Sequence, residues 1–186
     1  KLRTMTQTSM IGTLTTNKGV TMGGKALDGN RITNEAAYNL FFSIVRDNNI
    51  VDKAEKLLLC GSARRGKKKC GDLDIVFQDN ETGDFKAWLL ESFGTKKNGK
   101  PQNTALIEGV QVEFYEATLE TWGTCTLMWT GSKWNNIKLR KAAKARDLKL
   151  SQHGLFDGNG NNLAAGKTES EVFELLGFDY IEPQKR

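Results

Sequence analysis

The chain has 186 residues, 38% of them hydrophobic and 26% charged, which is typical of one compact globular unit or two small lobes. Its 27 basic and 22 acidic residues give a net charge of +5, as expected of a protein whose partner is rich in phosphate. The sequence has neither an apolar run long enough to cross a membrane nor a signal-peptide pattern, so we expect a soluble intracellular protein without membrane contact.

The cysteines do not indicate a zinc site. Cys60, Cys70 and Cys125 lack CxxC spacing, and His153 is the single histidine. Reduced thiols of an intracellular protein are the simplest interpretation. Residues 1–30 are rich in Thr and Gly, and we interpret them as an N-terminal arm or as partly non-native sequence.

From Thr33 onward the pattern predicts alternating helices and strands. The first helix has its apolar residues on one face, at Ala37, Leu40, Phe41 and Val45. The elements expected after it are strands at 56–60 and 72–77, a helix at 84–93, a basic turn at 95–104 and a strand near 109–117. We therefore expect an α/β lobe over residues 31–120.

The remainder, residues 121–186, predicts a smaller basic α+β lobe. A basic helix at 133–149 is expected to turn a few residues toward a core, namely Trp134, Ile137 and Ala142 or Ala145. Residues 153–162 resemble a hairpin with a Gly/Asn turn. A capping box formed by Thr168 and Glu171 begins the last helix.

Asp72 and Asp74 are one residue apart on an expected strand, so both side chains project to the same face. Such a pair is either a solvated strand end or a site where a divalent cation neutralises the repulsion. Carboxylate oxygens suit Mg²⁺ or Mn²⁺, and Mg²⁺ commonly completes its shell with substrate phosphates.

The loop before the aspartates favours the cation. It begins with Gly61 and Ser62, continues with five cations, and ends with Gly71 directly before Asp72. Glycines allow the backbone to approach a ligand, and amides, a hydroxyl and cations together suit phosphate. We therefore expect a nucleoside triphosphate between this loop and the aspartates.

Two-metal phosphoryl transfer needs a further carboxylate, and Glu113 is the best candidate. In the strand VQVEFYE, alternation places Glu113 on the face opposite Val112 and Phe114. Glu108 and Glu116 are the rival candidates.

Several motifs resemble family X of the DNA polymerases, within the nucleotidyltransferase superfamily. The stretch GSARRGKKKCGDLDIVF, 61–77, resembles the palm motif of that family, and WTGSKWNNIKLR, 129–140, resembles its nucleotide-binding segment. LGFDYIEPQKR, 176–186, is similar to its ending, and HGLFD, 153–157, to a stretch of its terminal-transferase-like branch. The resemblance implies an α+β fold: a nucleotidyltransferase palm, which is a mixed sheet flanked by helices, and a small C-terminal α+β lobe.

The resemblance also implies the roles of the palm residues. Asp72, Asp74 and Glu113 would be catalytic ligands of two Mg²⁺ or Mn²⁺ ions, although the family carries aspartate where Glu113 stands. The extra methylene could move that carboxylate by about an ångström. The residues implied at the triphosphate are Gly61, Ser62, Arg65, Cys70 and Gly71. Cys70 replaces a common serine, and a thiol is the poorer hydrogen-bond donor.

In the second lobe the resemblance implies nucleotide and DNA contacts. The residues against the incoming sugar are Trp129, Thr130 and Gly131, Asn136 contacts the base, and Arg140 reaches the template. Met128 replaces a Tyr or Gly common in the family. The lysines expected at the DNA backbone are Lys133, Lys138 and Lys141 on the helix and Lys96 and Lys97 in the turn.

We therefore expect a monomeric DNA polymerase of a compact form without the N-terminal lyase domain. It would add deoxynucleotides to a DNA 3′ end, filling short gaps during repair, with gapped or primer-template DNA and a dNTP as partners. Template-independent terminal transfer or end joining is the alternative, favoured by Trp129 and by the C-terminal likeness. A nucleotidyltransferase for a non-DNA acceptor and a non-catalytic DNA-binding module are further alternatives.

Overall fold

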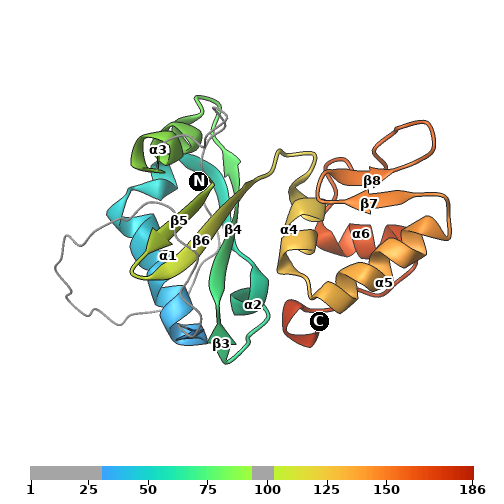
Figure 1. Ribbon diagram of the computed structural model, residues 1–186. Helices are drawn as coiled ribbons and strands as arrows, with labels where there is room; N and C mark the ends of the chain where they lie inside the picture. Colours follow the sequence, from blue (N-terminus) through green and yellow to red (C-terminus); the bar gives the residue numbers. More distant parts are fainter. Residues whose placement is uncertain (1–30, 94–102) are drawn as a thin grey trace.

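The structure is a computed structural model that describes residues 31–93 and 103–186, and the statements below concern those residues. The predicted N-terminal arm, Lys96 and Lys97 lie outside them. Figure 1 shows two groups of elements side by side: a sheet with helices packed on it, and a helical group carrying a short hairpin. The predicted α+β class is confirmed.

A four-stranded mixed sheet with the order β2-β4-β6-β5 forms the first group. Its strands are β2 (Ala54–Leu59), β4 (Asp72–Asp79), β5 (Thr104–Ile107) and β6 (Val110–Glu116). The central strands β4 and β6 run parallel, and β2 and β5 pair antiparallel at the two edges. A second, small pair joins β1 (Ile32–Thr33) to β3 (Lys69–Cys70).

Two helices, α1 (Asn34–Asp47) and α3 (Asp84–Phe93), pack on one face of this sheet. The main core forms there from alternate strand residues and helix residues, including Leu73, Ile75, Val112, Phe114, Leu40 and Phe85. The hydroxyl of Thr33 caps α1 by accepting the Ala36 N–H at 3.1 Å. Both helices were predicted; the predicted Val45 packs partly buried against this core, and its neighbour Ile44 is the more deeply buried.

The other face of the sheet packs against α2 (Gly61–Arg64) and α4 (Trp122–Thr130). Cys60, Val76, Ala117 and Cys125 form a small buried cluster there. Helix α4 was not predicted. Its residues from Gly123 to Met128 are all buried, so it lacks the apolar period that reveals a half-exposed helix.

The second group contains α5 (Lys133–Lys144), the hairpin of β7 (Lys149–Ser151) and β8 (Gly154–Phe156), and α6 (Glu169–Leu175). These elements share a core that includes Leu139, Ala143, Leu155, Val172 and Phe173. The predicted capping box is confirmed: Thr168 Oγ1 accepts the Glu171 N–H at 3.3 Å, and the Glu171 carboxylate accepts the Thr168 N–H at 2.8 Å. Short 3₁₀ turns span Ile50–Asp52 and Pro183–Lys185.

The predicted core face of α5 is wrong. The helix ends at Lys144, and its buried residues are Asn135, Leu139 and Ala143, which lie at i, i+4 and i+8. Trp134 is 75% exposed and Ala145 is also exposed, while Ile137 and Ala142 are only half-buried. The polar residue Asn135 takes the core-facing position, because it can donate its side-chain N–H to the Gly131 carbonyl.

The predicted hairpin is displaced along the chain. Its tight turn lies at residues 152–153, between β7 and β8, and not in the Gly/Asn stretch. That stretch forms the next loop, which a single bridge between Phe156 and Asn162 closes. No helix in the described ranges is both long and apolar enough to span a bilayer.

Candidate active site

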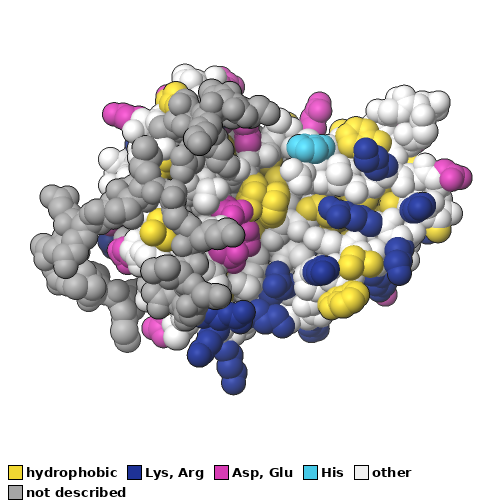
Figure 2. All heavy atoms as spheres, in the orientation of Figure 1, with side chains coloured by type: hydrophobic (Ala, Val, Ile, Leu, Met, Phe, Trp, Pro, Cys, Tyr) yellow, Lys and Arg dark blue, Asp and Glu magenta, His cyan; other side chains and the backbone are white. Residues whose placement is uncertain are grey.

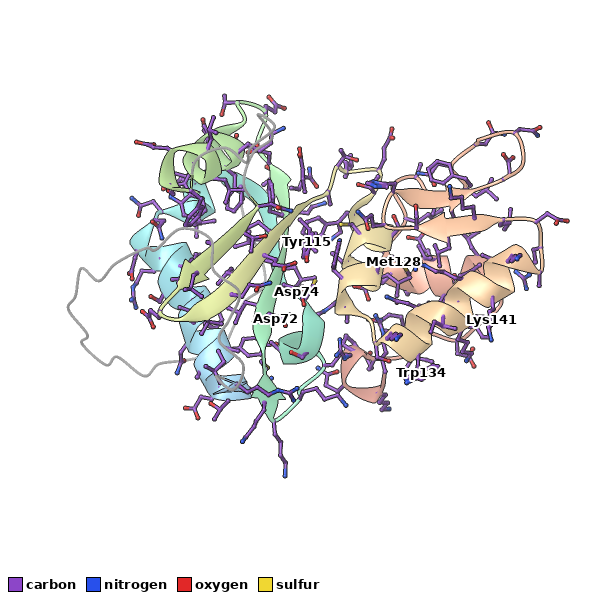
Figure 3. The ribbon with its side chains drawn as sticks, viewed as in Figure 1. Asp72, Asp74, Tyr115, Met128, Trp134 and Lys141 are labelled. Atoms are coloured by element: carbon purple, nitrogen blue, oxygen red, sulfur yellow. The ribbon has the colours of Figure 1, made fainter. Side chains whose placement is uncertain are left out.

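Asp72 and Asp74 lie on the face of the sheet that is turned toward α4 (Figure 3), and a third carboxylate, Glu113, lies beside Asp74 on the neighbouring strand. Because β4 and β6 are parallel neighbours, Asp74 pairs with Glu113 and Asp72 pairs with Gln111. Asp72 is exposed, and Asp74 and Glu113 are half-buried. The strands therefore bring together the three carboxylates that the sequence singled out.

Burial and mutual repulsion perturb this cluster. Desolvation, followed by the charges of Asp72 and Glu113, raises the pKa of Asp74 to about 7. Desolvation, followed by the charge of Glu113, also raises the pKa of Asp72. The cluster therefore favours a proton or a cation between the carboxylates.

The Glu113 carboxylate accepts hydrogen bonds from two other side chains of β6. The hydroxyl of Tyr115 donates to Oε2 and the amide of Gln111 donates to Oε1. As the side chains stand, no three His, Cys, Asp or Glu residues in the described parts of the chain form a group able to hold a metal ion. The three carboxylates are nevertheless a donor set of oxygen atoms on one face, which is the kind that Mg²⁺ and Mn²⁺ prefer.

Helix α2 begins directly against Asp74. Gly61 has a φ of +59°, and the Cys60 N–H donates to the Asp74 backbone carbonyl at 2.7 Å. A Cβ added at Gly61 would lie 2.0 Å from Asp74 Oδ2. Glycine is required here for both the backbone conformation and the close approach to the carboxylate.

The loop that contains α2 is tied to the C-terminal end of α4 through Thr130. Arg64 Nη1 donates to Thr130 Oγ1 at 2.5 Å, and Arg65 Nη1 donates to the Thr130 carbonyl. Gly131 follows in close contact, since a Cβ there would lie 3.2 Å from Arg65 Nη1. The predicted phosphate loop and the predicted Thr-Gly-Ser segment are therefore adjacent.

Several predicted nucleotide contacts have polar atoms that are buried and lack a hydrogen-bond partner within the described residues. These atoms are Ser62 Oγ, Arg65 Nε and Asn136 Oδ1, whereas the Trp129 N–H lies within reach of the Cys125 thiol. Such atoms are costly unless a ligand or solvent pairs with them. Their presence in three residues chosen from the sequence for nucleotide binding supports a polar ligand at this site.

One predicted phosphate contact, Cys70, is placed differently, whereas Gly71 leaves open space beside Asp72. The thiol of Cys70 is fully buried in the main core, and its Sγ contacts the Lys67 carbonyl at 3.8 Å. Gly71 is exposed, and nothing lies within 4 Å of where its Cβ would be. The structure therefore does not bring the Cys70 side chain to the site.

Helix α5 carries the predicted base and DNA contacts. Asn136 donates to the Met128 carbonyl at 2.8 Å, and Arg140 lies 3.7 Å from Met128 Sδ. Lys133, Lys138 and Lys141 are exposed, and Lys138 Nζ lies 4.4 Å from the centroid of the Phe178 ring. Figure 2 shows Lys and Arg side chains gathered over this part of the molecule, while acidic side chains gather near the sheet.

A buried ion network links α2 to the C-terminal segment, and it was not predicted. Arg64 pairs with Glu169, and Arg186 Nη2 lies 2.8 Å from the other oxygen of Glu169. The Arg186 guanidinium carbon also lies 5.1 Å from the centroid of the Phe173 ring and 5.2 Å from that of the Tyr180 ring, within the range of cation–π contacts. Since Arg64 and Glu169 are 105 residues apart, no local spacing could reveal the pair.

Comparison with known proteins agrees with this geometry. Residues 31–150 match the family model for the DNA polymerase beta palm, and residues 125–186 match that for the DNA polymerase beta thumb. The chain is 28% identical over 170 residues to "Repair DNA polymerase X" of African swine fever virus, covering 86% of this chain and 97% of that protein. It is 30% identical over 166 residues to "DNA polymerase lambda" of Arabidopsis thaliana, covering 69% of this chain.

The chain spans only 31% of the length of that plant relative. A solved structure of Leishmania infantum polymerase beta, in a ternary P/T complex, has a similar fold, with a TM-score of 0.66 at 19% identity, covering 85% of this chain and 77% of that chain. The palm match alone covers more than half of the chain, and the motifs, the sheet and the two family models agree. The chain therefore belongs to the DNA polymerase beta family, family X of the DNA polymerases.

Proposed function

We propose that this protein is a DNA polymerase that transfers a nucleotide from a dNTP to a DNA 3′ end and releases pyrophosphate. The observation that carries the proposal is the cluster of Asp72, Asp74 and Glu113 on one face of parallel strands, beside the loop that begins at Gly61. Membership of family X supports the same activity.

The carboxylates would hold two divalent ions, Mg²⁺ or Mn²⁺. Asp72 and Asp74 would bind both ions, and Glu113 would help to bind the one nearer the primer. The raised pKa of Asp74 fits this role, because burial and then repulsion within the cluster disfavour its bare charge, which a bound cation would neutralise. When bound, such ions lower the pKa of an attacking hydroxyl and neutralise charge on the leaving phosphates.

The residues of the loop and of the α4–α5 junction would bind the nucleotide. Ser62 Oγ and Arg65 Nε are buried polar atoms without a partner in the described ranges, and both suit phosphate oxygens. Thr130 and Gly131 would lie against the sugar, since Arg65 holds the Thr130 carbonyl next to the loop. Asn136 would present its Oδ1 to the base, since its amide N–H already donates to the Met128 carbonyl.

DNA would lie along α5. Its exposed cations, Lys133, Lys141 and Arg140, are suited to phosphate contacts, which supply most of the affinity for DNA. We propose short-gap filling during repair as the use of this activity, with a monomer acting on gapped or primer-template DNA.

Template-independent addition is the second candidate. Trp129 motivates this candidate, because it lies at the site and not in the main core. The Trp129 ring stacks on the Tyr115 ring, with the ring centroids 3.4 Å apart and the ring planes 13° apart. An aromatic at this position resembles the terminal-transferase-like branch of the family.

Primer extension on gapped, nicked and single-stranded DNA, with deoxy- and ribonucleotides, tests both candidates. We expect efficient addition of the complementary deoxynucleotide on gapped DNA, and none by the Asp72→Ala and Asp74→Ala variants. Addition that ignores the template base would favour the second candidate. Binding of gapped DNA without extension in Mg²⁺ or Mn²⁺ would contradict a polymerase and leave a binding module.

A further inference from the structure

Two side chains on β6, Gln111 and Tyr115, flank Glu113 and have no role in the reaction proposed above. Gln111, Glu113 and Tyr115 occupy every second position of the strand, so they share the face that carries the carboxylates. The Gln111 amide donates to one oxygen of Glu113, and the Tyr115 hydroxyl donates to the other. The same hydroxyl also lies within hydrogen-bonding reach of the Asp74 carboxylate. The Glu113 carboxylate is therefore held from both sides by its own strand.

The ring of Tyr115 is fixed in turn by α4. It stacks on the indole of Trp129 with nearly parallel planes, 13° apart, and both side chains are only half-exposed. Trp129 directly precedes Thr130, whose carbonyl and hydroxyl accept hydrogen bonds from Arg65 and Arg64. The hydroxyl that reaches Glu113 is thus anchored to the segment proposed to bind the nucleotide.

A glutamate needs such restraint more than an aspartate does. Its side chain has one more rotatable bond, and ordering a long side chain costs conformational entropy. Each carboxylate oxygen has two lone pairs, so Glu113 can accept from Tyr115 and Gln111 and still bind a cation. Hydrogen bonds of this kind commonly orient the ligands of metal sites.

We propose that Tyr115 is a positioning residue for Glu113: its hydroxyl, with the Gln111 amide on the other oxygen, orients the glutamate that this chain carries at the third carboxylate position. The inference rests on the proposed polymerase function. It assigns to the Trp129–Tyr115 stack the role of holding the hydroxyl in place.

The Tyr115→Phe variant isolates the hydroxyl, because phenylalanine keeps the ring and the stack on Trp129. On gapped DNA we expect kcat to fall by about 10- to 100-fold while KM for the dNTP changes little. Tyr38→Phe is the matched control, since Tyr38 lies on α1, away from the carboxylates, and is also half-buried. An unchanged kcat in Tyr115→Phe would overturn the proposal.

A double-mutant cycle tests whether Tyr115 acts through Glu113. In the Glu113→Asp background the shorter carboxylate no longer reaches the hydroxyl in the same way, so Tyr115→Phe should cost much less there than in the wild type. Equal costs in both backgrounds would mean that the hydroxyl acts independently of Glu113 and would overturn the proposal.

Mn²⁺ binding without DNA or nucleotide supplies a readout apart from activity. Titration followed by electron paramagnetic resonance should show about 10-fold weaker binding in Tyr115→Phe than in the wild type, and no change in Tyr38→Phe. If the wild type extends no primer but its Mn²⁺ affinity depends on the hydroxyl, the polymerase function fails and the positioning role stands. If the wild type extends primers and Tyr115→Phe matches it in both measurements, the positioning role fails and the function stands.

Discussion

Gly61 lies against the carboxylate of Asp74, so that a Cβ at residue 61 would meet Asp74 Oδ2 at 2.0 Å. The two residues come from different elements, the first turn of α2 and the middle of β4. The Asp74 carboxylate therefore lies directly against the backbone at the start of α2, and no side chain fits at residue 61 without displacing one of the two.

Gly61→Ala should therefore abolish nucleotide addition. The new methyl must displace the Asp74 carboxylate or shift α2, and a non-glycine residue is also strained at a φ of +59°. We expect at least about a 100-fold loss in kcat/KM on gapped DNA, given the cost of misplacing a reacting group. Gly158→Ala is the control, because nothing lies within 4 Å of its added Cβ. Activity of Gly61→Ala close to that of the wild type would contradict the close approach.

Asp74→Asn should change how the stability of the metal-free protein depends on pH. The pKa of Asp74 is raised to about 7, so the folded state binds more protons than the unfolded state between the ordinary aspartate pKa and that value. The stability that this proton supplies is present below pH about 4 and is lost as the pH rises through 7.

Denaturant unfolding in EDTA tests that expectation. The free energy of unfolding of the wild type should fall relative to that of Asp74→Asn between pH 4.5 and pH 8, with Asp74→Asn the more stable at the higher value. Added Mg²⁺ should restore the wild type and have a smaller effect on the variant. Parallel pH profiles for the two proteins would show that Asp74 titrates normally.

Glu169→Gln should destabilise the protein strongly. Glu169 is 8% exposed and pairs with both Arg64 and Arg186, so its neutralisation leaves two guanidinium groups without a countercharge. Breaking a buried ion network from one side costs about 3 to 5 kcal/mol of unfolding free energy.

The exposed pair between Lys86 and Glu116 offers the comparison, since both side chains are nearly half-exposed. Glu116→Gln should cost at most about 1 kcal/mol. Chemical denaturation measures both variants, and similar losses in the two would mean that burial does not strengthen the Glu169 network.

Replacement of the exposed lysines of α5 should weaken DNA binding without sequence preference. For Lys133→Ala and Lys141→Ala we expect the slope of log K against log salt to fall by about 1 for each lysine that contacts a phosphate. Fluorescence anisotropy of labelled gapped DNA at several salt concentrations measures the slope. Lys86 lies on α3, at the far side of the sheet, so the control variant Lys86→Ala should leave the salt slope unchanged. An unchanged slope in the α5 variants would place the DNA elsewhere.

Much of the palm could be predicted because its pattern is local. Alternation on β4 and β6 predicted which side chains face the core, and the spacing of Asp72 and Asp74 predicted a shared face. Of the rival carboxylates, Glu108 lies in the turn before β6 and Glu116 pairs with Lys86, so Glu113 alone lies opposite Asp74.

The parts that escaped prediction depend on distant contacts. Helix α4 is buried all round, and Asn135 takes the core position on α5 because Gly131 offers it a carbonyl. The Arg64–Glu169–Arg186 network joins segments far apart in the sequence. The roles of the individual site residues stay predictions.

The parallel pairing of β4 and β6 also determines where the chain can tolerate a change of length. An inserted or deleted residue between Val110 and Glu113 would shift the register by one, and the side chain opposite Asp74 would become Val112 or Phe114. The loop 157–161, by contrast, closes on its own hydrogen bonds outside both cores, so it can lengthen without moving a carboxylate. Natural and engineered insertions should therefore accumulate in that loop and be absent from the first half of β6.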